Sequence, residues 1–161
     1  MASSTTRPRV QSVEQVRQVD LAFIAFSVLR VGFVVLPIAV GVDKFFDWMV
    51  DWRQYLWSGI PNHLHVSATT LMHAAGVFEI IAGLVVLIAP QLGGAMVAPW
   101  LGGIVIDLLL VGHDEHAYWD IALRDFGLML AAVALVALAT HYHPTVRPAY
   151  AARTVAERAS L

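Results

Sequence analysis

The sequence predicts an all-α integral membrane protein, a four-helix bundle with an additional interfacial amphipathic helix between spans one and two. Hydrophobic residues make up 58% of the 161 residues and charged residues only 14%, whereas soluble domains average about 25% charged. Four apolar windows approach or exceed the roughly 18 helical residues that cross a bilayer core. Five ionisable side chains lie inside these windows: Arg30, Glu79, Asp107, Arg124 and Asp125.

The first window covers about residues 21–42 and follows a short basic tail, residues 1–20. It is too long for the apolar part of a cleaved signal peptide, and Asp43 and Lys44 follow it where a cleavage site would have small residues. We therefore expect a retained membrane helix as the first span.

The segment at about residues 43–58 is too polar to span, but its aromatic residues recur at helical spacing. Tryptophan and tyrosine favour the headgroup zone, and a helix of this kind normally lies in the membrane plane. The sequence therefore predicts an interfacial anchor on membrane lipid, with a ligand lid as the alternative reading. Its members are Phe45, Trp48, Trp52 and Tyr55.

The remaining spans are predicted at about residues 71–89, 95–112 and 121–140, before a second tail at 141–161. The two tails together hold six arginines, whereas the loops on the opposite side hold only Lys44 and Arg53. By the positive-inside rule, we expect a multi-pass protein of the cell membrane with both termini cytoplasmic.

The ionisable residues inside the spans are the candidate functional site, because a charge at membrane depth is costly and usually functional. Counting about 1.5 Å per residue from the helix ends places Asp107 and Arg124 at nearly one level, as a candidate ion pair. Asp125 is the second candidate partner of Arg124.

Arg30 and Glu79 differ in depth by roughly 6 Å, which an arginine side chain can reach. His73 shares a helix stripe with Glu79 and could pass protons to the surface, and Gly76 and Gly83 near this stripe allow either close helix approach or room for a ligand. The competing interpretation is that all these charges only hold the helices together.

Other site classes are weaker or excluded. The chain has no cysteine, which excludes disulfides, thiolate metal sites and covalent haem attachment, so any redox chemistry needs a borrowed cofactor such as a quinone. The Lys and Arg residues form no basic stripe, which argues against nucleic-acid binding. Four histidines are weak candidates for metal ligands, and we favour the interpretation that they are solvated loop residues: His63, His65, His113 and His116.

Four segments together resemble the DoxX-like family of membrane proteins: LRVG at 29–32, GVDKFF at 41–46, GVFEIIAG at 76–83 and WDIALRDFGL at 119–128. The resemblance covers about residues 25–140. It implies a compact four-helix bundle, and the family includes a small subunit of a thiosulfate:quinone oxidoreductase and proteins linked with oxidative-stress complexes. Family positions with polar or charged residues match Arg30, Lys44, Glu79, Arg124 and Asp125, whereas the charge of Asp107 is a departure.

Three functions remain open from the sequence. The first is a membrane subunit that anchors a partner in a larger redox or respiratory complex, with a quinone-sized site in the outer half of the bundle. The second is a small proton-coupled transporter or lipid-handling protein, and the third a purely structural accessory subunit. Other protein subunits or further copies of the chain are the expected partners. We expect no enzyme activity of the chain alone, since it carries no recognisable catalytic motif.

Overall fold

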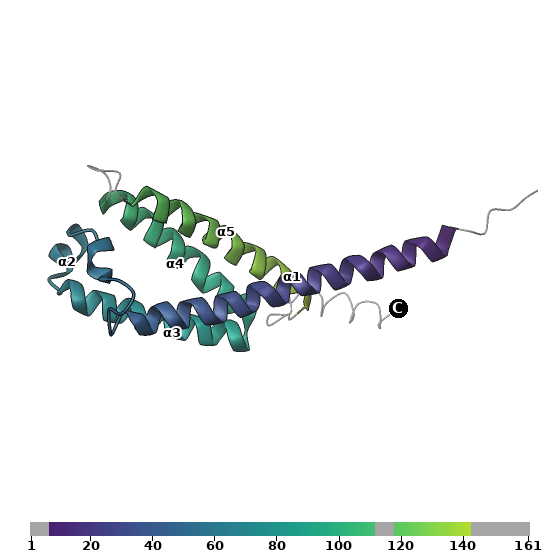
Figure 1. Cartoon of the computed structure of the whole chain (residues 1–161), viewed down its shortest axis with the longest axis horizontal. Coiled ribbons are helices and arrows are strands. Elements are labelled where there is room, and N and C mark those ends of the chain that lie inside the picture. The colour runs from purple at the N-terminus through teal and green to yellow at the C-terminus, as the bar shows by residue number, and fades with distance from the viewer. Residues whose placement is uncertain (1–6, 112–117, 143–161) are drawn as a thin grey trace, which may run out of the picture.

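The computed structural model describes residues 7–111 and 118–142, with side chains from Leu21 onward, and within these ranges it is helical and contains no strand. The predicted all-α fold is therefore confirmed (Figure 1). The elements are α1 (Arg7–Asp43), the 3₁₀ helix η1 (Trp52–Tyr55), α2 (Gly59–Leu64), α3 (Ala68–Ile88), α4 (Pro90–Val111) and α5 (Trp119–Tyr142).

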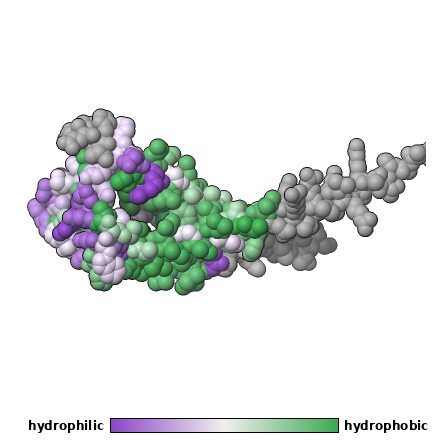
Figure 2. Space-filling view, viewed as in Figure 1, coloured by the Kyte–Doolittle hydropathy of each residue, from purple (hydrophilic) through white to green (hydrophobic). Residues whose placement is uncertain are grey.

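Four helices are long and apolar enough to cross a membrane, namely α3, α4, α5 and the part of α1 from Leu21 to Asp43. They form an up-down-up-down bundle in which α1 and α4 each pack against both α3 and α5. At most 28% of the residues in any of their apolar windows are buried. Hydrophobic residues cover the helices, and hydrophilic residues gather at the end that carries α2 (Figure 2). This is the architecture of a multi-pass membrane protein.

The bundle core is made of aromatic residues on α1 and small or branched residues on the other helices. Its buried members are Phe26, Phe33, Ala82, Val86, Val97, Ala132, Leu135 and Ala139. Alanines on α5 let neighbouring helices approach closely, as is common where lipid supplies no hydrophobic driving force. Far from α2, the ring of Tyr142 packs 5.6 Å from Phe23 and 5.7 Å from Phe26, measured between ring centroids, and so joins the first helix to the last.

Helices α1 and α3 cross in direct backbone contact. A Cβ atom added to Gly41 would lie 2.7 Å from the carbonyl oxygen of Gly76, and one added to Gly76 would lie 2.6 Å from that of Gly41. At Gly83, the same addition would meet the side chain of Ile38 at 2.7 Å. Of the two uses that the sequence left open for Gly76 and Gly83, the structure shows close helix approach, because α1 fills the space beside both.

The boundary between α3 and α4 differs from the prediction. The predicted spans at 71–89 and 95–112 leave residues 90–94 as a connection, but α4 begins at Pro90 and only Ala89 separates the two helices. Proline is well suited to the first helical position, where its missing N–H would be unpaired anyway. Gly93 then packs directly on the backbone of Val86, where a Cβ atom would lie 2.4 Å from the Val86 nitrogen. Gly93 therefore allows close packing between the two helices.

The connection between α1 and α3, residues 44–67, is called the cap below. The structure corrects the predicted amphipathic helix over residues 43–58: α1 ends at Asp43, turns and bends follow, and only the short η1 and α2 are helical. The physical reason is local. Asp47 adopts a left-handed conformation with φ 51°, and the Asp43 carboxylate accepts the N–H groups of Trp48 and Met49 that a helix would have paired internally.

Candidate functional site

A buried ion pair lies where α1, α3 and α4 meet the cap. Lys44 Nζ lies 2.7 Å from Glu79 Oε2, and the two side chains are only 7% and 8% exposed. The indole Nε1 of Trp100 donates to Glu79 Oε1 at 3.4 Å, and Lys44 Nζ also lies 4.0 Å from the ring centroid of Trp52. Both charges are therefore enclosed by protein and by aromatic rings. In such an environment, removing either charge leaves the other buried without a counter-charge.

The helix crossing explains how the two side chains meet. Side chains on an α-helix lean toward its N-terminus. Because α1 and α3 run antiparallel, Lys44 leans back into the bundle, while Glu79 leans toward the cap. The contact between Gly41 and Gly76 brings the two backbones together at this level, so the pair closes at hydrogen-bond distance.

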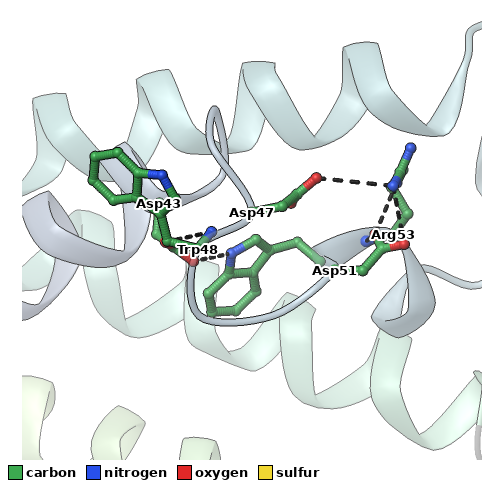
Figure 3. A network of polar contacts seen from close by, with 6 residues as sticks. Asp43, Asp47, Trp48, Asp51 and Arg53 are labelled. Atoms are coloured by element: carbon green, nitrogen blue, oxygen red, sulfur yellow. Dashed lines mark hydrogen bonds and ion pairs between the residues drawn. The ribbon is translucent and has the colours of Figure 1, made fainter.

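Next to this pair, Asp43 organises the cap. Its Oδ1 accepts from the backbone N–H groups of Trp48 and Met49, each at 3.1 Å, and its Oδ2 accepts from Trp52 Nε1 at 2.7 Å. Figure 3 shows the Asp43 carboxylate with its contact to Trp48. The ring of Trp52 thus lies against Lys44 while its N–H bonds Asp43, which links the buried pair to the loop.

The same view shows an exposed charge cluster in the cap. Arg53 Nε donates to Asp51 Oδ1 at 2.7 Å, and its guanidinium also lies 3.8 Å from Asp47 (Figure 3). The hydrogen bond from Arg53 holds the pKa of Asp51 below its usual range. The carboxylate therefore favours the folded cap above the ordinary carboxyl pKa, and this contribution is lost as the pH falls through the lowered one. Because the pair is solvent-exposed, it contributes little stability.

Arg30 does not reach Glu79, although the sequence placed them in one site. Its guanidinium donates instead to the carbonyl oxygen of Leu87, near the C-terminal end of α3. The antiparallel pairing accounts for this, since Gly41 lies beside Gly76 and Arg30 consequently lies at the level of Leu87, two turns from Glu79. His73 is half-buried and stacks on Phe45, with 4.9 Å between ring centroids.

The predicted ion pair between Asp107 and Arg124 is not formed. Arg124 Nε donates to Asp125 Oδ1 at 2.9 Å, which is the other partner that the sequence allowed. Asp125 is buried, whereas the Arg124 side chain is 63% exposed. Asp107 Oδ1 accepts the backbone N–H of Trp57 at 3.0 Å, so this carboxylate fastens the cap to α4. Counting residues from the helix ends could not show that the cap supplies the partner of Asp107.

Replacing Asp107 with alanine is expected to loosen the cap, because the Trp57 N–H loses an acceptor. A hydrogen bond to a charged group contributes about 1.5–3 kcal/mol, so amides of the cap should exchange faster with deuterium in the reconstituted protein. Asp107→Asn is the matched control, since its side-chain carbonyl oxygen can accept the same bond. Unchanged exchange in Asp107→Ala would show that other contacts hold the cap.

The predicted interfacial aromatic residues do not share one face. Phe45 stacks on His73, Trp52 bonds Asp43, and Tyr55 packs edge-on against Tyr118 at 5.1 Å between centroids. Trp48 is the most exposed of the four, with 76% of its surface exposed. The prediction treated the segment as one helix, so it grouped side chains that the folded loop sends in different directions.

The candidate metal ligands are only partly described. His63 Nδ1 lies 3.1 Å from the carbonyl oxygen of Gly59, and His65 follows α2 in a left-handed conformation with φ 53°. His113 and His116 lie outside the described residues. Within residues 7–111 and 118–142, no three His, Asp or Glu side chains lie close enough together to hold a metal ion.

The depth and spacing arguments left three residues out of the site, namely Asp43, Lys44 and Trp100, although the family resemblance includes Lys44. Lys44 was counted as a loop cation, but it follows Phe33 and Gly41 on the stripe of α1 that faces the bundle. Extending the inward-facing stripe beyond the apolar window would have identified it. Trp100 carries no charge and therefore gave no signal within an apolar span.

The chain matches no protein-family model, no curated protein and no solved structure. The proposal that follows therefore depends on the geometry of the bundle and on the resemblance of the sequence segments described above.

Proposed function

We propose that the chain is a DoxX-like membrane subunit that anchors a partner protein at the cell membrane. The partner is of the soluble redox class that the resemblance implies. The observation that carries the proposal is the length of α1, which continues as a helix from Leu21 back to Arg7, beyond the span (Figure 1). At 1.5 Å per residue, this arm, residues 7–20, adds about 20 Å. A helix that leaves the bundle in this way is suited to docking a partner.

The state of the intramembrane charges favours an anchor over a transporter. Proton-coupled transport needs a carboxyl group that can change its charge during a cycle. In the bundle, Glu79 is engaged by Lys44 and Asp125 by Arg124. No buried side-chain nitrogen or oxygen in the described part of the chain lacks a hydrogen-bond partner. Polar side chains that bind each other across helices can hold a bundle together, which is the role an anchor requires.

The charges of the cap support a cytoplasmic location for the arm and the tails. Six arginines belong to the tails, while Lys44 and Arg53 are the only Lys and Arg residues of the cap. Lys44 is buried against Glu79, and Arg53 is paired with Asp51. The cap therefore offers no unpaired Lys or Arg to compete with the tails, and the positive-inside rule favours the orientation with the cap outside.

A quinone site in the outer half of the bundle is a narrower proposal. A quinone needs polar contacts to its carbonyl oxygens inside an apolar slot. Lys44, Glu79 and Trp100 are chemically suited to these contacts, and the ring of Trp100 packs against Phe78 in a tilted arrangement, with 4.2 Å between ring centroids. Lys44 and Glu79 bind each other, however, so a quinone could use them only if the pair opens.

The anchoring function can be tested by extracting the protein gently from its own membrane and recording bound proteins and small molecules by native mass spectrometry. We expect a soluble redox protein to accompany the full chain. Val13→Pro should release it, because proline breaks a helix interior without changing the charge of the arm. Val13→Ala is the matched control and should retain the partner. A chain that carries only lipid, alone or as a dimer, would contradict anchoring and favour transport or lipid handling.

A further inference from the structure

Three apolar side chains project from the loop directly after α1. Phe46 is 56% exposed, Trp48 76% and Met49 71%. The rings of Phe46 and Trp48 stack on each other, with centroids 4.6 Å apart and an angle of 13° between their planes. These three side chains are called the tip below. An apolar surface of this size is unfavourable in water unless lipid or another apolar surface covers it.

The tip continues the lipid-facing side of α1. After Asp43 the chain makes one more turn of helix-like bonds, since Phe46 N–H donates to the Asp43 carbonyl oxygen at 3.0 Å and Asp47 N–H donates to it at 2.8 Å. Extending α1 by this turn places Phe46 near the angular position of Val28 and Val35, which are 65% and 56% exposed. The tip thus begins on the side that the membrane span turns toward lipid, within one turn of the end of that span.

The loop that carries the tip is fixed by buried charge. The Asp43 carboxylate holds the N–H groups of Trp48 and Met49, and Asp43 is only 3% exposed. Asp47 adopts the left-handed conformation that the sharp turn requires, and aspartate tolerates this conformation better than most residues. A defined loop therefore holds the three side chains exposed. Because this loop is already ordered, binding to a surface costs it little conformational entropy.

We propose that Phe46, Trp48 and Met49 form a preformed lipid-binding tip that inserts into the interfacial region of the leaflet on the cap side. Trp and Phe are favoured at this depth, where an apolar body meets a polar boundary. The charges beside the tip are Asp47, Asp51 and Arg53, which carry no net positive charge. The tip therefore requires no anionic lipid and binds a neutral phosphatidylcholine surface.

The test uses the full chain in vesicles with single-cysteine variants, which the cysteine-free sequence makes possible. Phe46→Cys and Met49→Cys carry a nitroxide label, and electron paramagnetic resonance measures collision with oxygen, which prefers lipid, and with a nickel chelate, which stays in water. Gln54→Cys, an exposed cap position, is the aqueous reference, and Ala39→Cys on the exposed face of α1 is the lipid reference. The oxygen-to-nickel ratio at both tip positions should lie several-fold above the aqueous reference and below the lipid reference.

The same ratio is expected in phosphatidylcholine alone and with added phosphatidylglycerol. In Asp43→Ala with Met49→Cys, the ratio should fall toward the aqueous reference, because the N–H groups of Trp48 and Met49 lose their side-chain acceptor. A ratio at both tip positions equal to that at residue 54 would overturn the proposal. So would insertion only in anionic vesicles, or protection from both reagents with spin-spin broadening, which would show that a second copy of the chain covers the tip.

Discussion

Replacing Glu79 with glutamine is expected to lower the free energy of unfolding by about 3–5 kcal/mol, the usual effect of removing one member of a buried ion pair. Glutamine keeps the size of the side chain, but it leaves the Lys44 ammonium enclosed without a counter-charge. The remaining contact, with the ring of Trp52 at 4.0 Å, compensates only part of this loss. Unfolding in mixed micelles, followed by circular dichroism, measures the change.

The double variant Lys44→Met with Glu79→Leu should recover most of this stability. Two apolar side chains of similar size remove both charges together, and such replacements are often neutral or stabilising. A thermodynamic cycle over Lys44→Met, Glu79→Leu and the double variant isolates the interaction between the side chains. Arg53→Gln is the control, because it breaks an exposed pair in the cap and should change stability little.

The result also separates the functional readings. If Glu79→Gln unfolds the bundle, the pair is structural, which argues against a transport role for Glu79. If the variant is as stable as the parent chain but loses a proton-dependent flux in vesicles, then Glu79 acts in transport and the proposed function is wrong.

Replacing Gly41 with alanine is expected to destabilise the bundle by about 1–3 kcal/mol, the usual cost of adding a methyl group to a close-packed contact. The new Cβ atom would lie 2.7 Å from the Gly76 carbonyl oxygen, a backbone atom that cannot move aside without shifting α3. Gly76→Ala should act similarly, since its Cβ atom would meet the Gly41 carbonyl oxygen at 2.6 Å. Chemical denaturation in micelles provides the measurement.

Gly32→Ala is the matched control on the same helix. A Cβ atom at Gly32 would have no other atom within 4 Å, and alanine favours a helix over glycine by about 1 kcal/mol. This variant should therefore be as stable as the parent chain or slightly more stable. Equal effects at positions 32 and 41 would contradict a specific role for the helix crossing. The crossing also sets the distance between Lys44 and Glu79, so Gly41→Ala and Glu79→Gln are expected to be non-additive.

The spans could be predicted because a bilayer imposes length and apolarity on any helix that crosses it, so the composition of each window carries the signal. The cap could not be predicted in the same way. Its aromatic residues recur at helical spacing, but the Asp43 carboxylate offers their backbone N–H groups another acceptor, and this preference appears only once the loop has folded. Residues 90–94 fell between two predicted spans, whereas the structure includes them in α4, where Gly93 packs on Val86.

The candidate site was predictable in its residue types but not in its pairs. Glu79 and Asp125 were identified because a carboxyl group is conspicuous in an apolar window, and both are buried. Their partners depend on which helices are neighbours and how they are aligned. Arg30 lies two helical turns away from Glu79. The actual partner of Glu79 is Lys44, which lies one residue beyond the end of α1. Helix alignment is fixed by the glycine contacts, which a single sequence shows only as small residues.

The single residue between α3 and α4 also bears on how the nascent chain enters the membrane. Two spans joined only by Ala89 have to insert as one hairpin, because neither helix can move into lipid while its neighbour stays behind. This hairpin brings the Glu79 carboxyl group into the hydrocarbon. Its counter-charge lies earlier in the chain and has already left the ribosome. A hairpin that has not yet met α1 exposes a lone carboxyl group to lipid, so the cost of that state drives the helices together during synthesis.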